Sequence, residues 1–276
     1  ENNIEVNNLS KKYDTFELKN INFTVPKGSI VGFVGENGAG KTTTIKSILN
    51  ITNSSGSIKI LGKNIKQYEK EIKQNIGVVL DDSFLSEYLT AKQINSIMKD
   101  IYNEWNENKY INYLKQFNLP INKLLKDYSS GMKVKLKIAT AISHNPKLLI
   151  LDEPITGLDP MAIQDFYSMI RKLNREDKVA IIMVSHDLRN AVEEANKILH
   201  LQKQVLFYGP AHDYMNSKAA GHFFHEKEQG ECLPTAACHM AKNVDGLENN
   251  EQKCSCGHTH AHSPQKIEGG NTHERA

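Results

Sequence analysis

Residues 35–43 read GENGAGKTT, and they follow the apolar run IVGFV at residues 30–34. Their spacing matches the phosphate-loop pattern G-x-x-x-x-G-K-[ST] in full. The glycines let consecutive backbone N–H groups point into the loop, and the helical spacing of Ile45, Ile48 and Leu49 places a helix N-terminus directly after it. An ordinary strand-to-helix turn rarely combines these glycines with a lysine and a hydroxyl. We therefore predict that a nucleotide binds at Gly35, Glu36, Asn37, Gly38, Ala39, Gly40, Lys41, Thr42 and Thr43.

A pair of carboxylates follows the apolar run at residues 148–151. Asp152 suits water-mediated coordination of Mg²⁺, and Glu153 can polarise an attacking water molecule. The hydroxyl of Thr42 is a second predicted Mg²⁺ ligand, and Lys41 supplies a positive charge to the phosphates. Two carboxylates after an apolar run also occur in solvated turns. Together with the loop, however, they predict hydrolysis of the bound nucleotide.

The overall charge indicates neither a nucleic-acid partner nor a membrane-surface partner, since 34 Lys and Arg residues stand against 32 Asp and Glu residues. The longest apolar runs, at residues 148–151 and 179–184, are far shorter than the roughly 20 residues that a membrane span needs. The first residues show no secretory leader, and the four cysteines all lie beyond residue 230. We therefore expect a cytoplasmic protein whose main body has no disulfide.

The order of periodic segments predicts an α/β fold. Alternating residues between positions 4 and 34 indicate short strands, and helical spacing between about 90 and 127 indicates a helical insert. Helices and strands then alternate, at residues 131–144, 148–151, 160–174 and 179–184, before two short strands at 197–201 and 204–208. We predict a P-loop NTPase core with a mostly parallel sheet, an N-terminal antiparallel β region and a helical insert subdomain.

The predicted domain covers residues 1–218, with its helical insert at about 88–145, and a tail covers residues 219–276. Apolar residues are sparse in the tail, so we expect it to be disordered. Its soft and borderline donors are adequate for Zn²⁺ or Cu⁺ and include Cys254, Cys256, His258, His260 and His262. Cys-x-Cys and His-x-His are not the usual structural-zinc spacings, so a solvated extension without metal remains the alternative.

Three further motifs complete a recognisable order: YSSGM at residues 128–132, TGLDP at 156–160 and VSHD at 184–187. With the loop and the acidic pair, they resemble the nucleotide-binding subunit of ATP-binding-cassette (ABC) transporters over roughly residues 3–215. The resemblance implies that His186 contacts the γ-phosphate of ATP and that Tyr13 stacks on adenine. It also implies that a partner subunit's ATP contacts Ser129, Ser130, Gly131 and Met132, with Asp159 shaping the partner's site.

The sequence departs from the family pattern at three positions. Asp81 stands where the family commonly has a Gln that senses Mg²⁺ and water, and an Asp at this position is still a possible Mg²⁺ ligand. Ser130 replaces a glycine of the family signature, and Met132 replaces a glutamine. Together, YSSGMKVKL at residues 128–136 and GVVLDD at 77–82 resemble the ABC-2-type exporter branch, which includes antimicrobial-peptide resistance systems.

The resemblance implies that two ATP-binding subunits, identical or different, enclose two ATP molecules. It also implies a separately encoded transmembrane permease, which residues 82–89 and the helical insert would face at the cytoplasmic side of the membrane. We expect an exporter of peptides, antibiotics or drugs. The alternatives are a soluble cassette ATPase acting on ribosomes or DNA, a non-hydrolysing regulatory binder, and a metal-linked transporter with a metal-binding tail.

Overall fold

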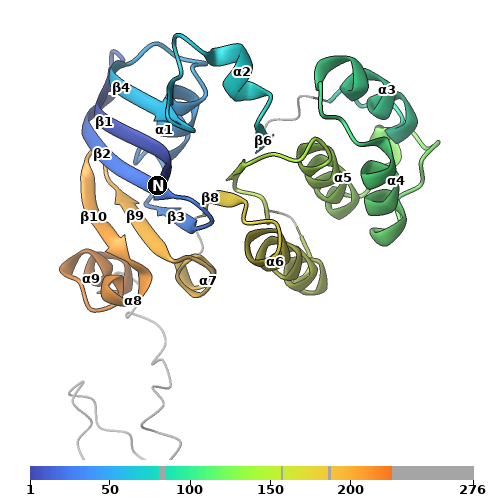
Figure 1. Ribbon diagram of the computed structural model, residues 1–276. Helices are drawn as coiled ribbons and strands as arrows, with labels where there is room; N and C mark the ends of the chain where they lie inside the picture. Colours follow the sequence, from blue (N-terminus) through green and yellow to red (C-terminus); the bar gives the residue numbers. More distant parts are fainter. Residues whose placement is uncertain (81–84, 157, 186–187, 226–276) are drawn as a thin grey trace, which may run out of the picture. The chain divides into compact units, whose positions relative to one another are not determined.

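The computed structural model describes residues 1–80, 85–156, 158–185 and 188–225 (Figure 1). Within them, the central element is a six-stranded sheet in the order β10-β9-β3-β8-β7-β6. The strands from β9 to β6 run parallel, and β10 (Val205–Pro210) joins β9 in the antiparallel sense. The other strands of this sheet are β3 (Ile30–Val34), β6 (Ile76–Val79), β7 (Leu148–Asp152), β8 (Ala180–Val184) and β9 (Lys197–Leu201).

A second, antiparallel sheet has the order β2-β1-β4-β5. Its strands are β1 (Asn2–Lys12), β2 (Glu17–Pro26), β4 (Ser55–Ile60) and β5 (Lys63–Asn64). Burial alternates along β2, where Ile21, Phe23 and Val25 face the core. The predicted antiparallel region is therefore confirmed, but β1 and β2 are longer than the short strands expected, because irregular register along β1 lets the pairing with β2 continue past each interruption.

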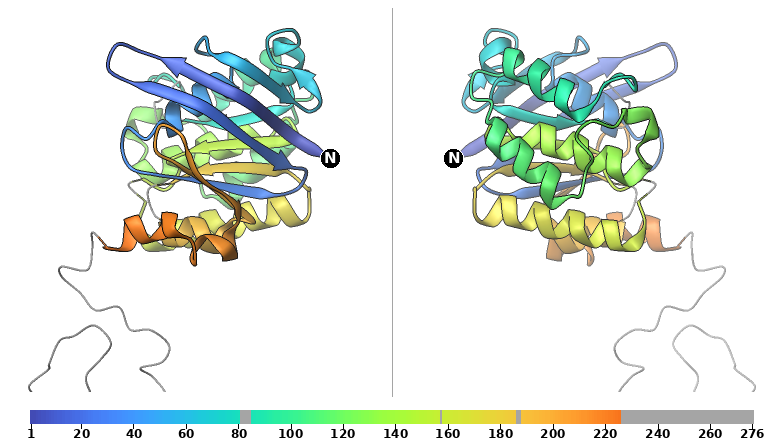
Figure 2. Two further views of the ribbon diagram at one scale, coloured as in Figure 1. Left: turned by 90° about the vertical axis from the view of Figure 1, so that its left-hand side faces the viewer. Right: turned by 90° about the vertical axis from the view of Figure 1, so that its right-hand side faces the viewer.

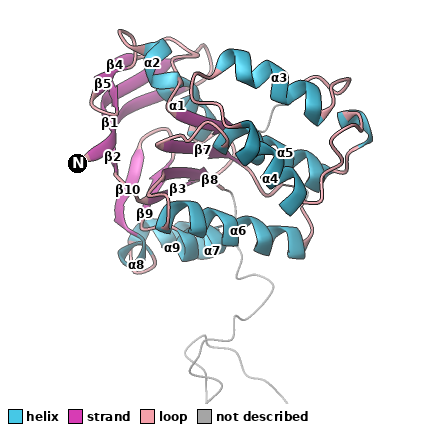
Figure 3. Ribbon diagram, turned by 45° about the vertical axis from the view of Figure 1, so that its right-hand side comes forward, coloured by secondary structure: helices cyan, strands magenta, loops and turns pink. Residues whose placement is uncertain are grey.

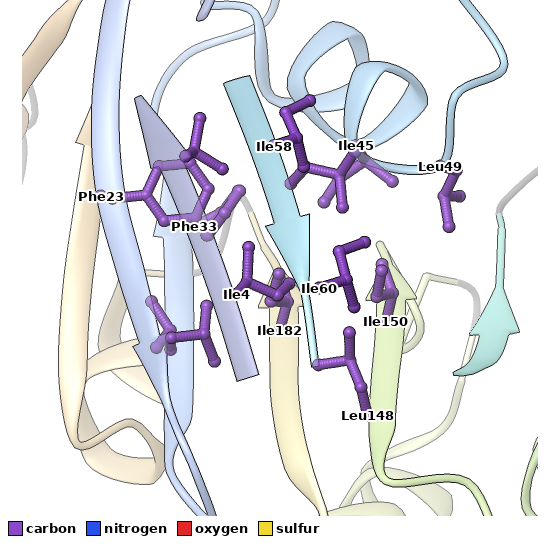
Figure 4. Close-up of a cluster of buried hydrophobic side chains, with 14 of the residues drawn as sticks. Ile4, Phe23, Phe33, Ile45, Leu49, Ile58, Ile60, Leu148, Ile150 and Ile182 are labelled. Carbon is purple, nitrogen blue, oxygen red and sulfur yellow. The ribbon is translucent and has the colours of Figure 1, made fainter. Parts of the chain in front are cut away.

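The first hydrophobic cluster lies between the two sheets (Figure 4). The antiparallel sheet contributes Ile4, Phe23, Ile58 and Ile60, and the parallel sheet contributes Phe33, Leu148, Ile150 and Ile182. The intervening helix contributes Ile45, and its C-cap residue Leu49 joins the same cluster. That helix, α1 (Lys41–Ile48), begins seven positions after β3 ends. Because β3 and α1 are both anchored in this cluster, the loop between them has fixed ends.

Helices cover the other face of the parallel sheet (Figure 3). They include α5 (Ser130–Ile142), α6 (Pro160–Arg175), α7 (Leu188–Glu194), α8 (Ala211–Tyr214) and α9 (Lys218–His225). Along α6, the buried residues Phe166, Ile170 and Leu173 recur at helical spacing and pack in one cluster with Ile181 and Ile198 of the sheet. The helix predicted at residues 160–174 is thereby confirmed.

The helical insert lies between β6 and β7 in the chain, and its helices form one side of the unit (Figure 2). It contains α3 (Ala91–Ile101), α4 (Glu107–Gln116), a 3₁₀ turn (Leu125–Asp127) and α5 (Ser130–Ile142), with the short α2 (Glu69–Lys73) preceding β6. Thr90 and Gln93 form a capping box at the start of α3, and Asn106 caps α4. A third hydrophobic cluster joins these helices, which confirms the predicted insert.

The compact unit continues to Lys227, past the domain end predicted at residue 218. That boundary falls at the first residue of α9. The helix starts there because the Ser217 hydroxyl accepts the backbone N–H of Ala220, and Ala220 is buried in the second cluster. Residues 219–225 of the predicted tail thus belong to α9, and the rest of that tail lies outside the described residues. The tail residues Cys254, Cys256, His258, His260 and His262 lie outside the described residues.

No helix in the described part of the chain combines the length and the apolar character that spanning a membrane requires.

Candidate nucleotide site

The glycine loop leaves the carboxyl end of β3, a fully buried strand between β8 and β9. Gly35 has φ +148°, and a Cβ there would lie 2.3 Å from the Leu201 carbonyl oxygen of β9. Gly40 has φ +104°, and its Cβ would lie 2.6 Å from Leu18 Cδ1 of β2. Gly38, at φ +78°, has open space on its Cβ side. Other parts of the protein therefore pack closely against Gly35 and Gly40, at the two ends of the loop, whereas the space beside Gly38 in the middle is open.

Lys41 spans the loop that precedes it. Its side chain is mostly buried, and Nζ donates to the carbonyl oxygens of Gly35 at 2.7 Å and Glu36 at 3.2 Å. Burial lowers the pKa of Lys41, while the nearby Glu153 and Asp152 act in the opposite direction. These carboxylates are therefore electrostatic neighbours of the lysine, although they lie more than a hundred residues away in the sequence.

Asp152 and Glu153 reach this place because β7 and β8 are parallel neighbours and β8 lies beside β3. Asp152 ends β7 and is 4% exposed. Glu153 has φ +47°, a left-handed conformation that is rare outside glycine, and its N–H donates to the Val184 carbonyl at 3.2 Å. A strained backbone of this kind persists where its surroundings hold it, and such positions cluster at functional sites.

The site fits ATP with Mg²⁺ on the chemistry of its donors. Backbone N–H groups at the start of α1, an open glycine loop and a buried lysine suit phosphates. Thr42 is exposed in the first turn of α1, and its hydroxyl and the Asp152 carboxylate would hold the ion. No group of three or more His, Cys, Asp or Glu side chains in the described residues could hold a metal alone. Mg²⁺ in proteins is usually held by one or two carboxylates together with substrate phosphates, so phosphate oxygens would share the ion with these side chains.

Tyr13 lies in the turn between β1 and β2, and 43% of its surface is exposed, which excludes a core role. Its ring lies 6.2 Å from that of Phe16, and the Tyr13 N–H donates to the Phe16 carbonyl. Phe16 Cζ lies 3.2 Å from where a Cβ on Gly40 would stand. Through Phe16, which the sequence analysis did not single out, this turn lies against the glycine loop. The exposed Tyr13 ring has Lys11 Nζ 4.9 Å from its centroid, so a stacked base would have to approach the ring beside that lysine.

Residues 129–132 form the head of α5. Ser129 is the N-cap, and its hydroxyl accepts the Met132 N–H at 3.3 Å; Ser130 is exposed and Met132 is half-buried. A Cβ on Gly131 would lie 3.6 Å from Leu158 Cδ2, which brings this helix head beside the turn before α6. In that turn, Asp159 is exposed and caps α6 by accepting the Ala162 N–H at 2.9 Å. Ser129 and Asp159 both serve as helix caps here, and their exposure leaves them accessible to a further partner.

Two predicted residues, Asp81 and His186, lie outside the described residues. Their described neighbours follow the ends of β6 and β8, where Leu80 accepts a hydrogen bond from Lys137 Nζ at 3.2 Å and Ser185 donates its N–H to Phe33 at 3.1 Å. Lys137 is a second residue that sequence reasoning missed. The available signal was the spacing of Lys133 and Lys137, which are four positions apart and therefore lie on one face of the helix.

A cavity of about 740 Å³ occupies the opposite, amino edge of the parallel sheet, where residues before β3, β7 and β8 line it, such as Lys27, Lys147 and Lys178. The glycine loop does not take part in it.

Comparison with known proteins supports this reading. Residues 18–156 match the family model described as ABC transporter. The zinc uptake system ATP-binding protein ZurA of Listeria monocytogenes is 32% identical over 227 residues, covering 77% of this chain and 88% of the relative. The bacitracin transport ATP-binding protein BcrA of Enterococcus faecalis is 36% identical over 199 residues, covering 71% of this chain and 65% of the relative.

Solved structures agree with the fold. An ATP-binding subunit of an ABC transporter superposes with a TM-score of 0.72 at 26% identity, over 81% of this chain and 98% of its own. A dimeric ATP-binding cassette in a post-hydrolysis state with ADP and Pi superposes with a TM-score of 0.68 at 23% identity, over 75% of this chain and 98% of its own. The chain belongs to the ABC transporter family, as an ATP-binding subunit that hydrolyses ATP.

Proposed function

We propose that this chain drives a membrane transporter from two composite sites, each formed by the glycine loop of one subunit and the α5 head of another. The observation that carries the proposal is the meeting of Lys41 with Asp152 and Glu153 at the carboxyl edge of the sheet. The exposed Ser129, Ser130 and Asp159 support it, because they are free to face a second subunit.

In this proposal the chain's residues divide the chemistry. Lys41 and the loop N–H groups bind the phosphates, Thr42 and Asp152 hold Mg²⁺, and Glu153 orients the attacking water. The second subunit contributes residues 129–132 across the interface, and Tyr13 stacks on the base. Asp81 and His186 complete the same site by resemblance alone. Bound Mg²⁺ supplies charge neutralisation for phosphoryl transfer.

The proposed transporter is an exporter of peptides, antibiotics or drugs, with a separately encoded permease at the cytoplasmic face of the membrane and no nucleic acid. The bacitracin transport relative, at 36% identity, favours this direction. A second candidate is metal uptake, favoured by the zinc uptake relative that this chain matches over 88% of its length. Under that candidate, the Cys and His residues of the tail would bind Zn²⁺ or Cu⁺.

Reconstitution with the co-purifying permease in proteoliposomes separates the two candidates. Stimulation of ATP hydrolysis by a peptide antibiotic such as bacitracin supports export. Stimulation by Zn²⁺ presented with a metal-binding protein, and none by peptides, supports metal uptake. Recovery of the chain with ribosomes or DNA and no permease would contradict both.

Glu153→Gln tests the ATPase site itself. Gln keeps the size of the side chain but cannot act as a base, so we expect kcat to fall by on the order of 100-fold or more while ATP binding persists. In the presence of ATP, the variant should then accumulate as a stable dimer, whose mass is measured by light scattering after size-exclusion chromatography. Glu176→Gln, at the exposed C-terminus of α6, is the matched control and should keep wild-type turnover. Wild-type turnover in Glu153→Gln would falsify the assignment.

A further inference from the structure

One face of α5 follows β6 from end to end. At the start of the strand, the buried ring of His144, just beyond α5, donates from Nε2 to the Ile76 carbonyl at 3.1 Å. One residue further, Gly77 approaches α5 so closely that a Cβ would lie 2.3 Å from the Ala141 carbonyl oxygen. The residue number rises along β6 while it falls along α5, so the two elements are antiparallel. The head of α5 therefore lies toward the carboxyl end of β6.

At that end, two lysines one helical turn apart hold the chain that leaves β6. Lys137 Nζ donates to the Leu80 carbonyl at 3.2 Å in a half-buried position. Lys133 Nζ forms an ion pair with Glu87 Oε1 at 2.7 Å, and this contact lowers the pKa of Glu87. Between them, Leu85 is buried in the third cluster with Leu136 of α5. The described ends of the stretch from Leu80 to Glu87 are thus both attached to α5.

The Leu80 carbonyl also lies beside the candidate site. β6 and β7 are parallel with Val79 opposite Leu151, so Leu80 is level with Asp152 at the same sheet edge. On the other side, Lys137 and Ser129 belong to one continuous element, of which Ser129 is the cap. The hydrogen bond of Lys137 therefore connects two places directly. One is the sheet edge that carries Asp152 and Glu153, and the other is the head of α5, which would complete the ATP site of the partner subunit.

We propose that Lys137 is a positioning residue for ATP hydrolysis, which sets the place of the α5 head relative to the carboxyl edge of β6. The proposal rests on the proposed function, in which these two places serve two different ATP molecules. A charge-assisted hydrogen bond to a carbonyl in a half-buried position is stronger than a neutral one and holds a fixed distance. Loss of that bond leaves both elements folded but free to shift at this end, since Gly77 and His144 still hold the other.

The test compares the full-length wild-type chain with Lys137→Met and Lys137→Arg. Met keeps an apolar stem of similar length and loses the donor, whereas Arg keeps a donor. Lys172→Met, which removes an exposed lysine from α6, is the control. Three quantities are measured for each: Kd for a fluorescent ATP analogue, kcat and KM for ATP hydrolysis, and Tm.

We expect Lys137→Met to lower kcat about tenfold, equivalent to about 1.4 kcal/mol in the barrier. Its Kd should stay at the wild-type value, its Tm should fall by no more than a few degrees for the one lost bond, and Lys137→Arg should restore most of the lost kcat. A merely structural role would lower Tm and leave kcat of the folded fraction unchanged, and that result overturns the proposal. So does wild-type kcat in Lys137→Met while Glu153→Gln is inactive. Wild-type turnover in Glu153→Gln would instead overturn the proposed function and, with it, the role of Lys137.

Discussion

At the scale of the residue, the site depends on backbone conformations that side chains oppose. Gly35 combines a positive φ with the Leu201 carbonyl at its back, whereas Gly38 has a positive φ and open space. Substitutions at these two glycines therefore distinguish the cost of a steric clash from the cost of backbone strain alone. Glu153 shows that a non-glycine residue can hold such a conformation here, where its N–H is bonded to β8.

We predict that Gly35→Ala destabilises the chain by about 3 kcal/mol or more, because strain and a backbone clash add. Gly38→Ala should cost about 1 kcal/mol, since strain acts alone. Urea denaturation midpoints measure both. Equal losses of stability in the two variants would contradict this prediction and would mean that β9 moves to make room for the new methyl group.

At the scale of the element, α5 and β6 form a unit through buried contacts that include a titratable group. Burial lowers the pKa of His144 from its ordinary 6.5 to about 4, with a smaller contribution from Lys109 of α4 in the same direction. The Ile76 carbonyl opposes this shift and holds the neutral ring as a donor. Tyr102 stacks on the ring at 3.8 Å. In the folded chain His144 thus stays neutral at pH values where the unfolded chain binds a proton.

Stability should accordingly fall as the pH falls. Between pH 6.5 and 4 the unfolded state binds more protons at this position, so the contribution is complete above 6.5 and is lost toward 4. We predict that the free energy of unfolding drops by about 2 kcal/mol from pH 7.5 to 5 on account of His144. His144→Gln keeps a donor for Ile76 and should lack this part of the pH dependence in urea denaturation. Identical pH profiles for the two chains would refute the prediction.

The secondary-structure elements also show how much of the fold could be predicted from the sequence. The glycine loop, β7 with its acids and the insert helices were predictable, because their signals are local: spacing, periodicity and caps. The helices α2, α7 and α8 were missed because elements of four to seven residues carry too few turns for periodicity to show. The contacts of Phe16 with Gly40 and of Lys137 with Leu80 join residues far apart in sequence, so no local pattern encodes them.

At the scale of the whole molecule, one chain carries two halves that belong to different sites in the proposed dimer. The glycine loop with Lys41 serves the chain's own ATP, and the α5 head with Gly131 serves its partner's. Lys41→Ala removes the buried phosphate donor, and Gly131→Glu places a negative charge where phosphates would bind. Each homodimer of either variant has two defective sites, so each variant alone should be inactive.

A mixed dimer of one Lys41→Ala chain and one Gly131→Glu chain keeps one native site. One site combines the altered loop with the altered α5 head, and the other combines a native loop with a native head. Random exchange at equal amounts makes about half of the dimers mixed, each with one native site, so we predict recovery of about a quarter of wild-type turnover. Steady-state ATPase assays of the mixture, against each variant alone, measure it. A mixture that stays as inactive as its components would show that each chain hydrolyses ATP with its own residues alone.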